Sequence, residues 1–461
     1  MSETPSNHDN EIYIENPKGL IVALCMVLMF SVMNGTMFNI AIPDIANAFD
    51  LMPSEVSWVM TGYIMIYAIG ALTYGKLADF YPFKTLITFG LSVFFIGSLF
   101  GFFAQSYAMV LVARVIQAVG ASMLPALVFL APIRYFPKER GKILGIISSV
   151  MAFASGIGPI IGGLIAGSLS WEYLFLTSSL IIISLPFLRK NFPHEEKKEA
   201  KVDFIGAFFI GGTVSTLLIG ITMGIGTAFI GTVLLLFLFL WRSKTAANPF
   251  VPPHLFKNRN YVITVITSFF SIFCLFGMMF TLPIMLRDVH ALTTMGIGLV
   301  MFPGAMSAAL IGQKGGRLVD EKGSRLVLIA TLILLSVGLL IISVVAGLSV
   351  FIISACMILV MMNFPLVQAS SADLLANILP KEETGVGMGV FNLMNFVAGA
   401  LSGALIGKAL DIHRPEQSIN ILAQSGASAA YSDIFLVLMV IIIGSMLLFR
   451  TVYTKNEATE P

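Results

Sequence analysis

Long apolar runs follow one another through almost the whole chain of 461 residues, and they constrain the fold more than any other feature. A helix of about 20 mostly apolar residues spans the hydrocarbon core of a bilayer. We count fourteen such runs, separated by short polar connections. They lie at residues 19–42, 57–75, 85–104, 108–131, 143–166, 173–188, 204–223, 227–241, 261–286, 293–312, 326–346, 350–372, 386–409 and 434–449.

The composition supports the same interpretation, because 57% of the residues are hydrophobic and only 11% are charged. A soluble chain is roughly 45–50% apolar and about 25% charged, so we expect an all-α membrane protein in contact with the lipid bilayer. The net charge of +2 argues against a nucleic acid partner. No metal-ligand spacing and no phosphate-binding G-x4-G-K-[ST] occurs, so the sequence predicts no metal, no cofactor and no enzyme.

The basic residues predict which way the chain crosses the membrane, since cytosolic connections are enriched in Lys and Arg. With the amino terminus in the cytosol, all but four of the 27 basic residues fall in cytosolic segments. Arg114 lies within a span, and Arg287, Lys408 and Arg414 face outward. We therefore expect a multi-pass protein of the plasma membrane with both termini cytosolic.

One short pattern occurs twice, as GKLADFYPFK from Gly75 to Lys84 and as GRLVDEKGSR from Gly316 to Arg325. The offset is 241 residues, and Pro43 and Pro283 repeat at an almost equal offset of 240. The spans therefore form two like-oriented six-helix bundles with two inserted helices, fourteen transmembrane helices in all. The predicted segments are a tail (1–17), the first bundle (18–190), a linker (191–203), the inserted hairpin (204–245), the second bundle (246–450) and a tail (451–461).

Two parallel repeats are an architecture of secondary transporters. The duplicated G-x-L-x-D loop resembles the signature loop of the major facilitator superfamily. Fourteen spans resemble its drug:proton antiporter branch, which includes multidrug and tetracycline exporters of Gram-positive bacteria. The resemblance implies that the loop latches the two bundles together on the cytosolic side. It assigns this gating role to Gly75, Asp79 and Lys84, with Asp320 as a weaker second copy.

Arg114 is a second candidate, because a cation inside a membrane span is costly and by default marks a functional site. The segment ARVIQAVGAS resembles the family pattern R-x-x-Q-G-x-G at Arg114, Gln117 and Gly120. By family analogy Arg114 faces the first span. We expect it to hydrogen-bond Asn34 and Gln117 and not to form an ion pair. The alternative is an arginine that reaches out to the membrane surface.

The fifth span resembles the antiporter signature G-x8-G-x3-G-P-x2-G-G, with Ala154 in place of the middle glycine. Small residues allow close helix packing, and proline bends a helix. Within the superfamily this motif marks exporters. Its matching residues are Gly145, Gly158, Pro159, Gly162 and Gly163.

Proton-coupled relatives carry a carboxylate in the middle of the first span, whereas this chain has Asn34 and Gly35 at those places. Gly399 stands where the tetracycline type has an acid in the thirteenth span. Asparagine cannot titrate, and arginine stays protonated. Any coupled proton must then use a peripheral carboxylate, for which we select Asp44 at the outer end of the first span.

Amide and apolar side chains remain to form a substrate pocket, with Phe and Met numerous enough to repack around varied ligands. The candidates are Asn34, Asn39, Asn363, Asn392 and Asn395. We predict a monomeric, proton-coupled exporter of small amphipathic or apolar compounds that works by alternating access. Two alternatives stay open: an uncoupled or differently coupled exporter of metabolites or lipids, and a membrane sensor that does not transport.

Overall fold

The computed structural model describes most of the chain and consists of helices and their connections. The described residues are 16–78, 81–136, 140–193, 195, 203–246, 249, 251, 253–412, 418–420, 426 and 428–457. Asp79, most of the predicted linker, most of the first predicted tail and the last four residues of the chain lie outside them. The helices are α1 (Pro17–Ile40), α2 (Ile42–Phe49), α3 (Pro53–Val56), α4 (Trp58–Leu77), α5 (Phe83–Phe102), α6 (Tyr107–Ala121), α7 (Met123–Tyr135), α8 (Arg140–Ser168), α9 (Tyr173–Ser179), η1 (Leu180–Ile183), α10 (Ser184–Asn191), α11 (Phe204–Met223), α12 (Gly226–Thr245), η2 (Pro253–Lys257), α13 (Arg259–Asp288), α14 (Thr294–Lys322), α15 (Ser324–Val345), α16 (Val350–Met361), α17 (Asn363–Ile378), α18 (Lys381–Ile412) and α19 (Ala429–Glu457).

Twelve helical segments of the described residues are long and apolar enough to cross a membrane, and two shorter apolar helices accompany them. The shorter ones are Tyr107–Ala121 and Phe153–Ser168, which overlap the predicted runs at 108–131 and 143–166. Twelve of the fourteen runs are therefore confirmed as long apolar helices. That the chain crosses the membrane fourteen times stays a prediction.

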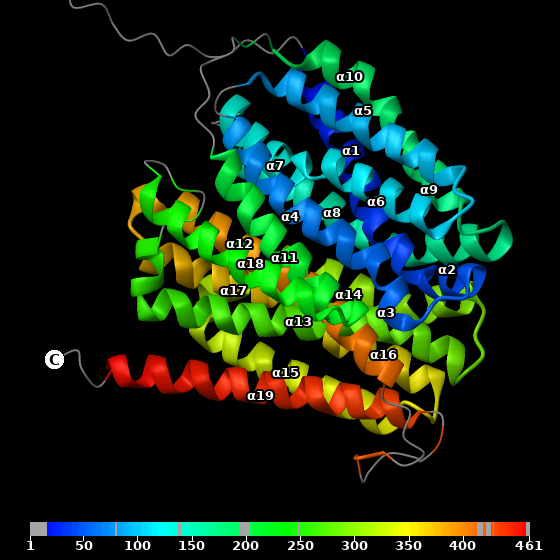
Figure 1. Ribbon diagram of the computed structural model, residues 1–461. Helices are drawn as coiled ribbons and strands as arrows, with labels where there is room; N and C mark the ends of the chain where they lie inside the picture. The colour runs from blue at the N-terminus through cyan, green and yellow to red at the C-terminus, as the bar shows by residue number, and fades with distance from the viewer. Residues whose placement is uncertain are drawn as a thin grey trace, which may run out of the picture.

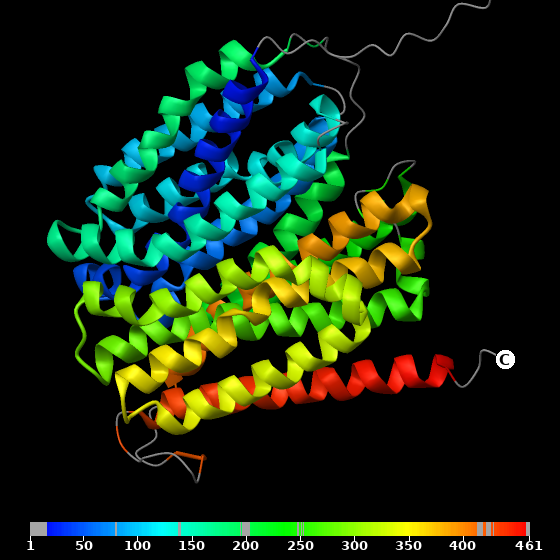
Figure 2. The same ribbon diagram turned by 180° about the vertical axis from the view of Figure 1, so that it is seen from behind.

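The helices form two groups that share a seam (Figures 1 and 2). The first group comprises α1 to α10, and the second comprises α13 to α19. We call the end of the molecule where α1 begins and α19 ends the terminal end, and the end that carries α2 and α3 the distal end. In both views the two groups converge at the distal end and diverge toward the terminal end.

The seam is formed by two long helix pairs, α8 with α14 and α4 with α18. Hydrogen bonds cross it toward the distal end: Ser54 N donates to Asp411 Oδ1 over 3.1 Å, and Thr61 Oγ1 donates to the carbonyl of Ala400 over 3.1 Å. The inserted hairpin lies beside this seam, because α11 packs on both α4 and α18. Helix α12 packs on α11. Only 17% of an 18-residue apolar stretch of α12 is buried.

Corresponding helices are interrupted at the same place in both groups. Helices α6 and α7 meet at Ser122, and α16 and α17 meet at Met362, an offset of 240 residues. Each interruption is followed three residues later by a proline, Pro125 or Pro365. A proline has no N–H for the carbonyl four residues earlier and weakens the helix there. The sequence analysis treated both spans as continuous helices.

Candidate functional site

Arg114 lies on α6 in the interior of the first group, with only 2% of the residue exposed. Its Nη1 donates to Asn34 Oδ1 over 3.0 Å and to Gln117 Oε1 over 3.1 Å. Its Nε donates to the backbone carbonyl of Val59 over 3.1 Å. The hydrogen bonds expected from the sequence are thus present, and among the described residues no carboxylate pairs with the guanidinium. The surface-reaching alternative is wrong, since the side chain is buried.

A second layer of hydrogen bonds fixes the two amides. Asn34 Nδ2 donates to Ser178 Oγ over 2.7 Å, and Gln117 Nε2 donates to Ser98 Oγ over 2.8 Å. Each serine hydroxyl in turn donates to a carbonyl of its own helix. The amide nitrogens therefore point away from Arg114, which leaves both amide oxygens to accept from it. The arginine network ties together α1, α4, α5, α6 and α9.

Aromatic rings complete the surroundings of the guanidinium. Its central carbon lies 4.3 Å from the ring centre of Phe38 and 4.0 Å from that of Tyr63. Cation–π contacts of this kind stabilise a desolvated cation by about 2 kcal/mol. Tyr63 stacks on Tyr67 at 5.8 Å, and Tyr67 meets Phe396 of α18 edge to face at 5.3 Å. A line of aromatic contacts thus runs from Arg114 across the seam into the second group.

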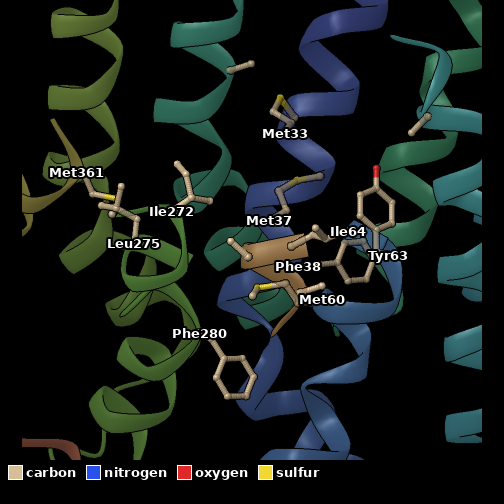
Figure 3. Close-up of a cluster of buried hydrophobic side chains, with 14 of the residues drawn as sticks. Met33, Met37, Phe38, Met60, Tyr63, Ile64, Ile272, Leu275, Phe280 and Met361 are labelled. Atoms are coloured by element: carbon tan, nitrogen blue, oxygen red, sulfur yellow. The ribbon is translucent and has the colours of Figure 1, made fainter. Parts of the chain in front are cut away.

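The seam around these rings is lined by methionines and other apolar side chains (Figure 3). Ile272, Leu275 and Met361 of the second group lie on one side of α1, and Phe38, Tyr63 and Ile64 lie on the other. Met33, Met37, Met60 and Met361 are all buried in the same cluster. Unbranched thioether side chains adapt to irregular shapes, which suits a surface that must repack.

The second group has its own buried polar network, centred on Asn395 of α18. Asn395 Nδ2 donates to Gln368 Oε1 over 3.0 Å, and Ser268 Oγ donates to Asn395 Oδ1 over 3.0 Å. The three residues come from α18, α17 and α13, and none of them is charged. We call this set the amide network.

The other asparagine candidates do not join either network. Asn363 is fully buried at the start of α17, where its Nδ2 donates to the carbonyls of Leu359 and Val360. Its Oδ1 is buried without a partner among the described residues. Asn39 is buried in α1, whereas Asn392 is exposed on α18.

Asp44 lies at the distal end and joins the two groups. Arg287 Nη2 of α13 lies 2.8 Å from Asp44 Oδ1, and Thr294 Oγ1 of α14 donates to Asp44 Oδ2 over 2.5 Å. Arg287 also donates to Thr294 over 2.7 Å, which closes a triangle. We call these three residues the distal latch. The position of Asp44 at this end was predicted from the sequence, but its partners Arg287 and Thr294 were not.

The duplicated loops differ from each other in structure. Gly75 lies in the last turn of α4, Lys84 lies in the first turn of α5, and Asp79 is outside the described residues. The second copy is not a loop over most of its length, because α14 continues to Lys322 and ends at Gly323, whose φ is +82°. Asp320 is therefore an exposed helical residue.

A cluster of contacts lies next to the first loop and was not predicted from the sequence. Glu195 accepts from Arg134 Nε at 3.0 Å, from the Tyr135 hydroxyl at 2.7 Å and from the backbone N of Phe83 at 3.0 Å. Arg134 also donates to the carbonyl of Ala78 over 2.9 Å. We call this set the Glu195 brace. The sequence placed Glu195 in the predicted linker (191–203), and no periodic signal in that charged stretch distinguishes it from its neighbours.

The small residues of α8 face two helices. A Cβ on Gly162 would lie 2.9 Å from the Cα of Met37 in α1. A Cβ on Gly163 would lie 3.0 Å from the carbonyl oxygen of Thr294 in α14, and Gly298 of α14 approaches the Pro159 carbonyl in return. Gly158 faces Thr36 of α1, and Gly145 lies near the start of α8. The small residues of the motif thus allow α8 to pack closely against α1 of its own group and against α14 across the seam.

The chain is similar to curated transport and resistance proteins. It is 30% identical to the riboflavin transporter RibZ of Clostridioides difficile over 289 residues, which is 61% of this chain and 63% of that protein. It is 28% identical to the lincomycin resistance protein LmrB of Listeria monocytogenes over 65% of this chain and 66% of that protein. The methylenomycin A resistance protein of Bacillus subtilis is 29% identical over 64% and 65%, respectively. The matches cover just under two thirds of each relative's length.

Solved structures show the same fold at low sequence identity. A POT family transporter in complex with 5-aminolevulinic acid superposes with a TM-score of 0.69 and 14% identity, covering 96% of both chains. A bacterial homologue of the human lysosomal transporter Spinster, in an inward-facing and unoccupied conformation, gives 0.62 and 13%, covering 93% of this chain and 95% of that one. Residues 24–403 match the family model for the Major Facilitator Superfamily. Because this match takes in far more than half of the sequence, the chain belongs to the major facilitator superfamily.

Proposed function

We propose that the protein is a secondary active exporter of small amphipathic or apolar compounds, driven by proton antiport and working by alternating access. Its family consists of membrane transporters and not of enzymes. The names of two kinds of relative, lincomycin and methylenomycin resistance proteins, support export of drug-like molecules. The methionine-rich seam supports the same substrate class, since such surfaces accept varied apolar shapes.

The proposed topology has fourteen spans, with α6–α7 and α8 crossing as well as the twelve long helices. Both termini are then cytosolic and the distal end faces outward. In the described state the outer side is closed by the distal latch, so substrate would enter between the groups from the cytosolic side. We propose that the two groups are the moving bundles, that the inserted hairpin stays with the α4–α18 seam, and that a monomer in the cell membrane suffices.

The buried charge of Arg114 is the observation that most strongly supports the proposed charge preference for substrates. A cation inside a membrane protein is costly unless it is paired. Here amide oxygens, a carbonyl and two rings surround it without a described carboxylate. The seam therefore has a positive potential, which favours neutral and anionic compounds over cations.

Proton coupling, in this proposal, acts through Asp44. In the outward-open state the latch is broken and Asp44 faces the external solution, where it can bind a proton. Only ionised Asp44 can re-form the ion pair with Arg287, so closure of the outer side displaces this proton, and antiport requires its release on the cytosolic side as the inner side opens. Each charge of the pair is about one quarter exposed, so the latch is a modest, reversible contact.

The test is transport by the purified protein in liposomes with an imposed pH gradient, across cationic, neutral and anionic compounds of similar size. We expect neutral and anionic compounds to move against their gradients, with protons moving in the opposite direction. Asp44→Asn should uncouple the two fluxes. Proton-driven antiport that survives Asp44→Asn would exclude Asp44 as the coupling group.

A second candidate function is an uncoupled or differently coupled exporter. It is favoured by one observation: every carboxylate of the described helices lies near a helix end, so none is placed to carry a proton through the middle of the membrane. Transport that responds to a substrate gradient but not to a pH gradient would support this candidate. The absence of any transport would leave the sensor alternative.

Single cysteines test the topology. Cysteines introduced at Lys198 and at Gln417 should react with a membrane-impermeant thiol reagent from opposite sides. Lys198 should be protected in intact cells, and Gln417 should be labelled. Labelling of both from one side would contradict the fourteen-span topology. The native Cys25, Cys274 and Cys356 must first be replaced by serine or alanine, although the last two are buried.

A further inference from the structure

A cavity at the terminal end of the first group belongs to neither buried network. Its volume is about 650 Å³, and it lies between the first three turns of α5 and the region where α10 ends. The two helices are neighbours in Figure 1 and pack against each other. Helices α5 and α10 lie on the side of the first group away from the second group (Figure 1), so we expect a molecule bound in the cavity to lie off the transport path.

The free charge that lines this cavity is positive. Lys84 and Arg189 contribute to its wall, and within the described part of the chain neither side chain has an acidic partner. Glu195 also contributes, but both its carboxylate oxygens are engaged in the brace with Arg134, Tyr135 and Phe83. The partial positive charge at the N-terminus of α5 adds to the potential. The cavity therefore favours an anion.

Hydroxyl groups line the same side of the cavity. Thr85, Thr88 and Ser92 are spaced three and four residues apart on α5, so they share one face of that helix. The Thr88 hydroxyl donates to the carbonyl of Lys84, which leaves its oxygen free to accept. Two cations and three hydroxyls can contact a phosphate and the polar groups attached to it.

An apolar surface continues from the cavity along the membrane-facing side of the group. Phe89 of α5 is 57% exposed and Phe187 of α10 is 54% exposed. Ile96 lies two turns further along α5 and is also exposed. Exposed apolar side chains on a membrane helix contact acyl chains. The charged cavity and the apolar surface therefore match the two parts of one amphipathic molecule.

We propose that this cavity binds the headgroup of an anionic phospholipid from the leaflet at the terminal end. Its phosphate lies between Lys84 and Arg189, and its acyl chains lie over Phe89 and Phe187. The bound lipid bridges α5 and α10 beside the Glu195 brace. Lys84, the basic residue that closes the first signature loop, thereby has a lipid contact in addition to its expected role at the gate.

The test measures phosphatidylglycerol retained by the full-length protein in nanodiscs of phosphatidylcholine with a minority of phosphatidylglycerol, by native mass spectrometry. Basic residues near a charged lipid surface contribute about 1 kcal/mol each, so Lys84→Gln/Arg189→Gln should weaken retention roughly tenfold or more. The matched control is Lys18→Gln/Lys190→Gln, which removes the same charge at the same end from exposed residues outside the cavity wall. The control should retain the lipid.

A second variant separates a built site from general surface charge. Ser92→Phe keeps both cations but fills part of the cavity, and it should weaken retention as well. Equal loss in the control pair, or full retention in Ser92→Phe, would overturn the proposal. Displacement by inorganic phosphate would instead assign the cavity to a free anion. Thermal unfolding in the same nanodiscs confirms that each variant is folded, and the readout does not depend on transport.

Discussion

The two groups of helices each carry a copy of the G-x-L-x-D pattern, yet their buried polar networks have different chemistry. In the first group a cation is enclosed by Asn34, Gln117 and two aromatic rings. In the second group the described partners of Asn395 are Gln368 and Ser268, which are neutral. Duplication has therefore kept the frame of helices and not its electrostatics. We therefore expect the charge preference for substrates to depend on the first group more than on the second.

The largest expected difference between the two buried networks comes from removing the charge of Arg114. Arg114→Ala leaves the acceptors of Asn34 and Gln117 without a donor, at about 1–3 kcal/mol each, so we expect transport to fall at least about a hundredfold. The matched change in the amide network, Asn395→Ala, should cost several-fold. Rates are measured in liposomes at equal amounts of inserted protein. Equal losses would show that the two networks are equivalent and would contradict the comparison.

The duplicated loops give the next contrast. Asp79→Asn should abolish transport while the protein remains in the membrane, because the first loop is expected to latch the groups on the cytosolic side. Asp320→Asn should have a smaller effect, since Asp320 is an exposed helical residue. Transport and membrane content are measured together. Normal transport by Asp79→Asn would reduce the first loop to a simple turn.

Introducing an acid sharpens the comparison further. Asn34→Asp places a carboxylate against Arg114, where the ion pair favours the charged form, so this variant should fold and should gain activity toward cationic compounds. Asn395→Asp buries a carboxylate without a described cation and should lower the melting temperature. The pH dependence of cation export is measured for both. A pH profile and substrate range unchanged by Asn34→Asp would argue that the arginine network is purely structural.

The smallest effect concerns the aromatic contacts. Tyr63→Leu removes the ring at 4.0 Å from the Arg114 guanidinium and should reduce transport several-fold, in line with about 0.5–2 kcal/mol for a cation–π contact. Tyr63→Phe keeps the ring and should remain close to wild type. The same transport assay distinguishes them. Similar losses in both variants would assign the effect to the hydroxyl instead.

Much of the fold could be predicted because apolar length and duplication are local, repeated signals. Twelve predicted runs are long apolar helices, and the contacts of Arg114 with Asn34 and Gln117 were expected from the family resemblance, which places Arg114 against the first span. The interrupted helices could have been predicted too. Pro125 and Pro365 stand 240 residues apart, the repeat offset itself, within otherwise apolar runs.

Other contacts left no usable signal in the sequence. The partners of Asp44 lie 243 and 250 residues away, and they meet it only because the two groups converge at the distal end. Glu195 sits in a run of alternating charges, and its three partners become specific only once α5 and α7 are packed. The extension of α14 to Lys322 was also missed, since the polar signature was interpreted as a loop.

The helix interruptions at Ser122 and Met362 make the stiffness of the two groups vary along their length. A helix with intact hydrogen bonds is stiff, and bending concentrates where a proline removes one. Because the two interruptions are 240 residues apart and so occupy equivalent places in the two groups, we expect each group to bend there while its distal segment keeps its contacts. Helices α7 and α17, which follow the interruptions, would then move relative to α6 and α16. Pro125→Ala or Pro365→Ala would restore one backbone hydrogen bond and stiffen one group alone. The two groups would then bend to different extents.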